Sequence, residues 1–336
     1  MIAALRFLGA TALTLLGLLA VTFFIGRVVP VDPALAVAGD RASEAQLAAV
    51  REAMGLNRPL YVQFGRYVAA VARGDLGESI LTANPVAEDI ARVFPATLEL
   101  ATAGIVVGVL GGVPLGVWAA LRRGRAVDQL VRVTGLLGYS VPIFWLGMMA
   151  LVLFYVRLGW VAGPGRIDLA YYYAVPRVTG LLVVDGLLAG HLGAVRSALA
   201  HLALPALLLG YFSLAYISRM TRSFMLAELK KEYVTAARGR GVGEARVVWR
   251  HALRNAAVPL VTVVALSYAG LLEGSVLTET VFSWPGIGQY ITNALQNADM
   301  NAVLGGTLVI GAVFIVFNLV ADLLYRALDP RVRPQR

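Results

Sequence analysis

The sequence predicts an all-α integral membrane protein with six transmembrane helices, a helical extracytoplasmic subdomain and a charged cytoplasmic loop. Hydrophobic residues make up 59% of the 336 residues and charged residues only 15%, a balance that excludes an ordinary soluble domain. A transmembrane helix needs roughly 20 predominantly apolar residues to cross the bilayer core. Segments that approach or exceed this length lie at 2–29, 96–121, 133–156, 199–217, 258–277 and 303–325.

The segment 178–190 is the exception among the apolar stretches. It is short and carries Asp185 at its centre, so we expect an interfacial or re-entrant helix there rather than a span. The first segment, 2–29, is too long for a signal-peptide core and lacks a small-residue cleavage site. We therefore interpret it as an uncleaved transmembrane helix.

Basic residues set the orientation of these helices. Arginine and lysine concentrate in the loops 122–132 and 219–254 and in the tail 326–336. The positive-inside rule places such loops in the cytoplasm, and both termini are expected there too. The net charge of +9 therefore indicates membrane orientation, and no basic–aromatic motif points to nucleic acid.

Segment 30–95 is predicted to form three short helices outside the cytoplasm. The signals are a capping box of Ser43 and Gln46 with a stop at Gly55, an Asn57 cap with a stop at Gly74, and an amphipathic start after Asn84-Pro85. Near the other end of the chain, Trp284 suits a membrane–water boundary beside the turn Pro285-Gly286. A further short helix is expected at 287–298.

The most charged part of the chain is the stretch 225–261, which lies between two apolar runs. Good helix formers predict a helix at 225–238, and an acidic residue at position 244 suits the start of a second helix at 244–255. The residues expected to interrupt the helices are Gly239, Gly241 and Gly243. The sequence thus predicts a helix–turn–helix outside the bilayer.

The order of residues in this stretch resembles the EAA loop of permease subunits of bacterial ABC importers. The strings E-Y-V-x-x-A-R-x-[KR]-G and H-A-L-R-N-A-x-x-P look like the dipeptide/oligopeptide/nickel branch of that family, although Gly239-Arg240 stands where Ala-Lys is usual. In the family this loop docks on the ATPase. The resemblance therefore implies an ATPase-coupling role for Glu232, Tyr233, Ala236, Ala237, Arg238, Gly241, His251, Arg254 and Asn255.

Further strings extend the resemblance over nearly the whole chain. They are P-x-D-P-A, L-x-R-P-L-x-x-Q and G-D-L-G-x-S within 30–79, and LTETVFSWPGIG at 277–288. The resemblance implies a type I importer permease fold in the bacterial cytoplasmic membrane, with domains 1–29, 30–95 and 96–336 and a coupling loop at 219–255. It implies a second homologous permease, two ATPase subunits, an extracytoplasmic binding protein and a peptide substrate as partners.

The chain itself carries no recognisable catalytic or cofactor motif. It has no G-x-x-x-x-G-K-[ST] loop, so ATP hydrolysis is expected on separate subunits. It has no cysteine, and its three histidines are scattered, so we expect neither a metal site nor a cofactor. We therefore predict that the chain is not an enzyme.

Polar residues inside the predicted spans are the candidates for a pathway or gate, because placing them in lipid is costly. They are Tyr139, Ser140, Tyr211, Tyr216, Ser267, Tyr268, Glu273, Glu279 and Asn318. Serine, tyrosine and asparagine in spans also serve helix packing, so Glu273 is the strongest of them.

Three alternatives remain open at the level of the sequence. The same architecture imports nickel, glutathione or oligosaccharides in other members of the family. An autonomous secondary transporter would need intramembrane coupling groups and often an inverted repeat, and no repeat is evident. A membrane-embedded enzyme would need a nucleophile or a paired-carboxylate signature, which the spans lack.

Overall fold

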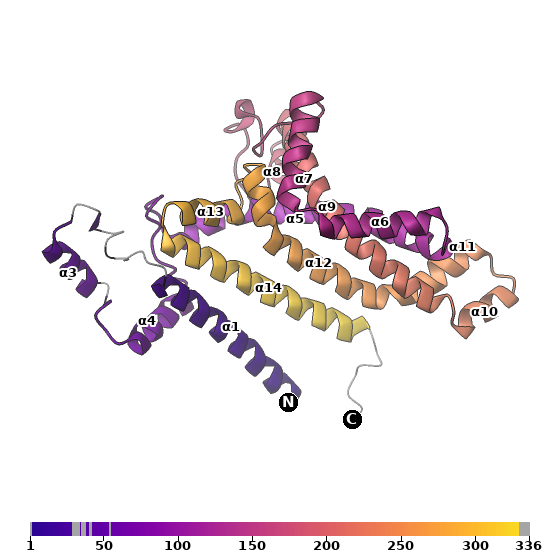
Figure 1. Ribbon diagram of the computed structural model, residues 1–336, viewed down its shortest axis with the longest axis horizontal. Coiled ribbons are helices and arrows are strands. Elements are labelled where there is room, and N and C mark those ends of the chain that lie inside the picture. Colours follow the sequence, from indigo (N-terminus) through magenta and orange to yellow (C-terminus); the bar gives the residue numbers. More distant parts are fainter. Residues whose placement is uncertain (1, 29–33, 35–37, 40–41, 54, 329–336) are drawn as a thin grey trace. The chain divides into compact units, whose positions relative to one another are not determined.

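The computed structural model describes residues 2–28, 34, 38–39, 42–53 and 55–328, with the side chains of 2–8, 27–28, 139 and 325–328 outside the description. Every named element in these ranges is helical, which confirms the predicted all-α fold (Figure 1). By their contacts, the residues form two compact units, Met1–Pro95 with Pro285–Ile315, and Ala96–Trp284 with Val316–Arg336. The predicted domains 1–29, 30–95 and 96–336 were defined by their position relative to a membrane. Contacts within the chain do not test that division, which stays a prediction.

The smaller unit is organised by short helices with clear start and stop signals. It contains α1 (Ile2–Val28), α3 (Glu44–Ala53), α4 (Leu60–Ala72), the start of α5 (Val86–Leu121), α13 (Ile287–Gln296) and the first half of α14 (Met300–Leu328). The capping box is confirmed, because Gln46 N donates to Ser43 Oγ at 3.3 Å and Ser43 N donates to Gln46 Oε1 at 2.9 Å. Gly55 and Gly74 follow α3 and α4 as the predicted stops, each with positive φ.

Two expectations for this region are wrong. Asn57 caps no helix, because α4 begins at Leu60 after Pro59, whose ring already fixes φ at −54°. The amphipathic helix after Asn84-Pro85 is not separate but forms the first turns of α5. No glycine occurs between Pro85 and Gly104, so the amphipathic start and the apolar span join into one helix of 36 residues.

The larger unit contains the remaining helices. They are the rest of α5, then α6 (Ala126–Ser140), α7 (Ile143–Ala150), a π-helical turn (Leu151–Arg157), a 3-10 turn (Leu169–Tyr171), α8 (Leu182–Leu188), α9 (Leu192–Glu228), α10 (Glu232–Gly239), α11 (Glu244–Arg246), a second π-helical turn (Val247–Ala252), α12 (Leu253–Val281) and the end of α14. Helix α9 is its centre and packs against α6, α8 and α12.

Glycines allow α5 to approach α9 closely. They recur every four residues on α5, at Gly104, Gly108, Gly112 and Gly116. A Cβ atom added at Gly108 would lie 2.1 Å from Ser213 Oγ, and one at Gly116 would lie 2.5 Å from Ser218 O. Such small-residue contacts hold helices together in lipid, where hydrophobicity alone does not drive association.

Among the described residues, five helices are long and apolar enough to cross a membrane, and α6 with α7 makes a sixth if the pair counts as one span. This pair is bent by 102°, which Figure 1 shows as the steep turn between the two helices. Pro142 causes the bend, because it lacks an N–H and forces Val141 into an extended conformation. The predicted span at 133–156 thus corresponds to this bent pair of helices.

Candidate functional site

The charged loop 219–255 is built around α10, which lies near the ends of the long helices α9 and α12 (Figure 1). Residues 229–231 separate α10 from α9, so the predicted continuous helix at 225–238 is wrong. No glycine or proline marks this break. Instead, Glu228 accepts hydrogen bonds from Lys231 Nζ at 2.6 Å and from the Tyr233 hydroxyl at 2.7 Å, and these bonds bridge the turn.

Helix α10 ends in a Schellman motif at Gly241. Val242 N donates to Ala237 O at 3.1 Å, and Gly241 N donates to Arg238 O at 2.9 Å. Gly241 adopts φ 75°, a left-handed conformation that costs other residues about 1–2 kcal/mol. The predicted stop is thus located at Gly241, whereas Gly239 is still helical.

Helix α10 packs on the second π-helical turn, which itself packs against the ends of three long helices. Val234 of α10 is fully buried. The π-helical turn contributes Val248 and Ala252 to a buried cluster. The other members, which come from the ends of α5, α9 and α12, are Val117, Ala120, Met225 and Ala256. A displacement of α10 would therefore act on the ends of these helices.

The chain beyond α10 forms one unbroken helix from Glu244 to Val281, because α11, the π-helical turn and α12 are continuous. The prediction of a separate helix at 244–255 is therefore wrong. No glycine occurs between Gly243 and Gly270, and Pro259 is accommodated inside α12. The second part of the loop and the fifth apolar segment thus belong to one continuous helix.

Six of the nine predicted ATPase-coupling residues are exposed, namely Glu232, Ala236, Arg238, Gly241, Arg254 and Asn255, and three are half-buried, namely Tyr233, Ala237 and His251. Arg238 pairs with Glu244 through two bonds, of 3.0 Å from Nε and 2.6 Å from Nη2, and so joins α10 to α11. Burial raises the pKa of Tyr233, so its hydroxyl keeps the proton that it donates to Glu228. These placements leave the contact with an ATPase a prediction.

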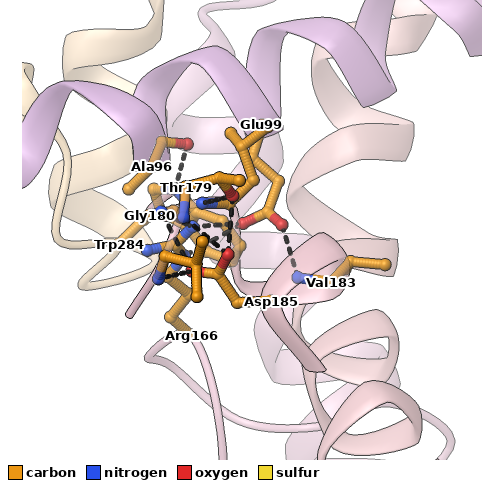
Figure 2. A network of polar contacts seen from close by, with 10 residues as sticks. Ala96, Glu99, Arg166, Thr179, Gly180, Val183, Asp185 and Trp284 are labelled. Atoms are coloured by element: carbon orange, nitrogen blue, oxygen red, sulfur yellow. Dashed lines mark hydrogen bonds and ion pairs between the residues drawn. The ribbon is translucent and has the colours of Figure 1, made fainter. Parts of the chain in front are cut away.

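A buried polar network in the larger unit joins Glu99 of α5 to Arg166 and to the start of α8 (Figure 2). Arg166 bonds to Glu99 Oε2 through Nη2 at 2.5 Å and Nε at 3.0 Å, and Nη2 also donates to Gly180 O at 2.8 Å. Only 8% of the Glu99 side chain and 16% of the Arg166 side chain are exposed. The network therefore fixes the segment 158–181 to α5.

Asp185 organises the backbone in front of α8. Its carboxylate accepts the N–H groups of Val178, Thr179 and Gly180, and also the Thr179 hydroxyl at 2.7 Å (Figure 2). Burial raises the pKa of Asp185, but these hydrogen bonds outweigh it and leave the pKa below its ordinary value. Asp185 is thus a loop-organising carboxylate in a helix of seven residues, which is too short to span a membrane.

Trp284 belongs to the same network and is only 1% exposed. Its Nε1 donates to Ala96 O at 2.8 Å, and the Arg166 guanidinium lies 5.7 Å from the ring centroid. The ring thus faces the interior of the unit, and its position at a membrane–water boundary stays a prediction. The ring is an internal anchor, and its N–H finds a partner as buried tryptophans require.

The two acidic pathway candidates differ sharply in burial. Glu279 is fully buried and accepts hydrogen bonds from Thr97 Oγ1 at 2.7 Å and Ser275 Oγ at 2.9 Å. Glu273 is exposed. Glu279 is thus placed to hold α12 to α5, whereas the Glu273 side chain is placed on the surface of this chain. A pathway role for either stays a prediction.

The other pathway candidates are mostly engaged in local packing. Their contacts are Ser140 Oγ to Leu136 O at 2.9 Å, Tyr211 Oη to Thr134 O at 2.9 Å, Ser267 Oγ to Val263 O at 2.8 Å, Tyr268 Oη with Thr102 Oγ1 at 2.8 Å, and the Tyr216 ring 5.7 Å from the Arg219 guanidinium. Asn318 is half-buried, and the side chain of Tyr139 lies outside the description.

We expect Glu279→Ala to lower the melting temperature of the purified protein in detergent, whereas Glu273→Ala leaves it nearly unchanged. The first change removes the shared acceptor of two buried hydroxyls, at a cost of about 1–3 kcal/mol. Differential scanning fluorimetry of both variants is the measurement. Equal melting temperatures for the two variants would contradict the structural role of Glu279.

A buried ion pair joins α6 to α9, and neither of its members was predicted from the sequence as a functional residue. Asp128 in α6 is fully buried and bonds to Arg222 of α9 through Nε and, at 2.9 Å, through Nη2. Arg132 reaches the same carboxylate at 3.5 Å but is 56% exposed. The two residues of the Asp128–Arg222 pair are 94 positions apart in the chain. The only signal for the pair in the sequence is that Asp128 is an acidic residue in an otherwise basic loop.

Within the described ranges, no three histidine, aspartate or glutamate side chains gather as a metal-binding group. Glu99 accepts hydrogen bonds from Arg166 and from Val183 N, and the indole N–H beside it bonds to Ala96 O, as Figure 2 shows. The chemistry of the network is that of a structural clamp between helices.

Residues 112–334 match the family described as "Binding-protein-dependent transport system inner membrane component", and residues 2–101 match the corresponding N-terminal family. The probable D,D-dipeptide transport system permease protein of Escherichia coli is 44% identical over 95% of this chain and 94% of its own. The di/tripeptide transport system permease protein of Pseudomonas aeruginosa is 43% identical over 98% of both chains. A solved structure of the methionine ABC transporter in inward-facing conformations matches with a TM-score of 0.49 at 18% identity, over 70% of this chain and 93% of that one.

Proposed function

The chain belongs to the inner membrane components of binding-protein-dependent transport systems, and from this membership we propose that it is the permease subunit of an ABC importer for short peptides. It would form half of the translocation pore in the cytoplasmic membrane, with the second half supplied by a homologous permease. Two ATPase subunits and an extracytoplasmic binding protein would complete the complex. The names of the full-length relatives, which refer to dipeptide and di/tripeptide transport, support peptides as the cargo.

The proposal that this chain couples to an ATPase is supported by the exposed and buried faces of α10 and by its well-defined ends. Five of the nine predicted coupling residues lie on α10; Glu232, Ala236 and Arg238 are exposed, Tyr233 and Ala237 are half-buried, and Val234 on the opposite face is fully buried. Hydrogen bonds to Glu228 bridge the turn before the helix, and a Schellman motif at Gly241 ends it. A short rigid helix with one buried and one exposed face suits docking into a groove of another subunit.

The same construction suggests how ATP binding would reach the pore. A force on α10 acts on the π-helical turn at 247–252 and hence on the continuous helix Glu244–Val281. ATP-bound and ATP-free partners must favour different arrangements of this helix, because a ligand shifts an equilibrium only by its differential affinity for the two states. The excess of basic residues in the loops supports cytoplasmic termini and a cytoplasmic α10.

Reconstitution in proteoliposomes tests the proposal. We expect the purified complex to accumulate labelled dipeptide only with ATP on the side of α10, and a protonophore to leave this uptake unchanged. Competition by nickel, glutathione or oligosaccharide, each with its own binding protein, would reassign the cargo without changing the architecture. Uptake that collapses with the protonophore while ATP is present would overturn the proposal in favour of a secondary transporter.

A further inference from the structure

We propose that a cavity in the smaller unit binds the ammonium headgroup of a membrane aminophospholipid. The cavity has a volume of about 260 Å³ and lies among α1, α4, α14 and the turn after α4. Its walls are formed by Phe23, Gly26, Tyr67, Ala70, Asp75, Leu76, Gly77, Met300, Asn301, Leu304 and Gly305. None of these residues is among the predicted ATPase-coupling or pathway residues.

The lining suits a cationic group. Asp75 supplies a carboxylate, which is positioned by the hydrogen bond that its Oδ1 accepts from Gly77 N at 2.9 Å. Tyr67 lies with its ring 5.8 Å from that of Phe23, and its hydroxyl is bonded to Thr22 Oγ1 at 3.1 Å. Aromatic faces beside a carboxylate are the usual means of holding an ammonium group. None of the lining residues is lysine, arginine or histidine, so an anion would find no countercharge there.

The size and position of the cavity indicate that the ammonium group belongs to a lipid. The cavity is smaller than the roughly 300–1,000 Å³ of pockets that enclose a whole drug-sized ligand, so it would hold one end of a larger molecule. Two of its walls are the apolar helices α1 and α14, which are both long enough to cross a membrane. Only 6% of the apolar window of α1 is buried. Acyl chains lying on this exposed apolar surface would extend from a headgroup held in the cavity.

Two of the glycines that line the cavity lie in close contact with neighbouring side chains. A Cβ atom added at Gly26 would lie 2.6 Å from Leu304 Cδ1, and one at Gly305 would lie 2.6 Å from Val86 Cγ1. Ala70, by contrast, already carries a Cβ and lines the cavity from α4. A longer side chain at Ala70 is thus the appropriate means of filling it.

The test is lipid binding to the intact complex, extracted in mild detergent, delipidated and titrated with phosphatidylethanolamine or phosphatidylglycerol under native mass spectrometry. We expect phosphatidylethanolamine to bind about tenfold more tightly, as one charge-assisted contact implies. Asp75→Asn should remove this preference, whereas Glu78→Gln, an exposed acidic residue in the same loop, should keep it. Ala70→Leu should weaken binding of the lipid, whereas Ala69→Leu on the exposed side of α4 should not.

Three results would overturn the proposal. One is equal affinity for the two lipids, and another is an unchanged preference in Asp75→Asn at an unchanged melting temperature. The third is displacement of bound phosphatidylethanolamine by free dipeptide, because the ammonium group would then be that of the cargo. Failure of peptide uptake in reconstitution would leave lipid binding unaffected, so this inference and the proposed function are tested separately.

Discussion

Replacing Gly241 with aspartate is expected to abolish ATP-driven uptake while the protein stays in the membrane at its normal level. Gly241 ends α10 with φ 75°, and no other group lies within 4 Å of a Cβ atom added there. The strain is therefore modest, about 1–2 kcal/mol, and too small to unfold the chain. In a docked interface, however, an unpaired charge costs several kcal/mol, and about 3 kcal/mol corresponds to a loss of about a hundredfold.

Gly190→Asp is the matched control for this prediction. Gly190 ends α8 in the same motif, with φ 67°, Gly190 N bonded to Leu187 O at 3.1 Å and His191 N bonded to Gly186 O at 2.9 Å. It too has nothing within 4 Å of an added Cβ. The control introduces the same strain and charge away from α10, and should retain uptake. Similar losses in both variants, at equal abundance, would show that backbone strain rather than docking is responsible.

Glu232→Lys tests the same surface from the other end of α10. Glu232 lies in the first helical turn, where a negative charge suits the helix dipole, and its side chain is exposed. Charge reversal there is expected to lower uptake and the ATPase activity of the complex together. Normal transport in both Gly241→Asp and Glu232→Lys would show that α10 is not the coupling element.

The largest effect on stability is expected from Arg222→Leu. This change leaves the fully buried Asp128 without its main partner, at a cost of about 3–5 kcal/mol, a large part of the about 5–15 kcal/mol that holds a typical protein folded. We expect the variant to be nearly absent from membranes, as measured by quantitative immunoblotting of the membrane fraction.

Arg132→Leu removes a cation from the same carboxylate and serves as the control. Arg132 is 56% exposed and 3.5 Å from Asp128, so its loss should cost no more than about 1 kcal/mol and leave abundance nearly normal. The double variant Asp128→Asn with Arg222→Leu should recover part of the lost protein, because no buried charge then remains unpaired. Equal abundance of the two single variants would refute the role assigned to the Asp128–Arg222 pair.

Composition was sufficient to predict the helical class, because a run of apolar residues long enough to cross a bilayer allows few other structures. Local signals also located the capping box at Ser43 and the stop at Gly241, since both depend on neighbouring residues only. The break at 229–231 could not be found this way, because the bonds to Glu228, rather than a helix-breaking residue, bridge it.

Contacts between residues far apart in the chain could not be predicted from the sequence either. Glu99 and Arg166 are 67 positions apart, and in the sequence each is an isolated charge within or near an apolar segment. The burial of Trp284 likewise depends on Ala96, which lies 188 positions earlier. An indole in an apolar protein fits both an interface and an interior, so the contact with Ala96 had to be seen in three dimensions.

Because the helix from Glu244 to Val281 is unbroken, the number of residues in it determines which way each of its side chains faces. Each residue turns an α-helix by about 100°, so one inserted residue would swing Glu279 away from Thr97 while leaving every local sequence signal intact. The π-helical turn at 247–252 is the place where such a change is most easily absorbed, because π turns accommodate an extra residue within a helix. In hybrids made from two related permeases, the junction therefore belongs before Glu244 or after Val281, where a difference in length leaves the angular order of the side chains unchanged.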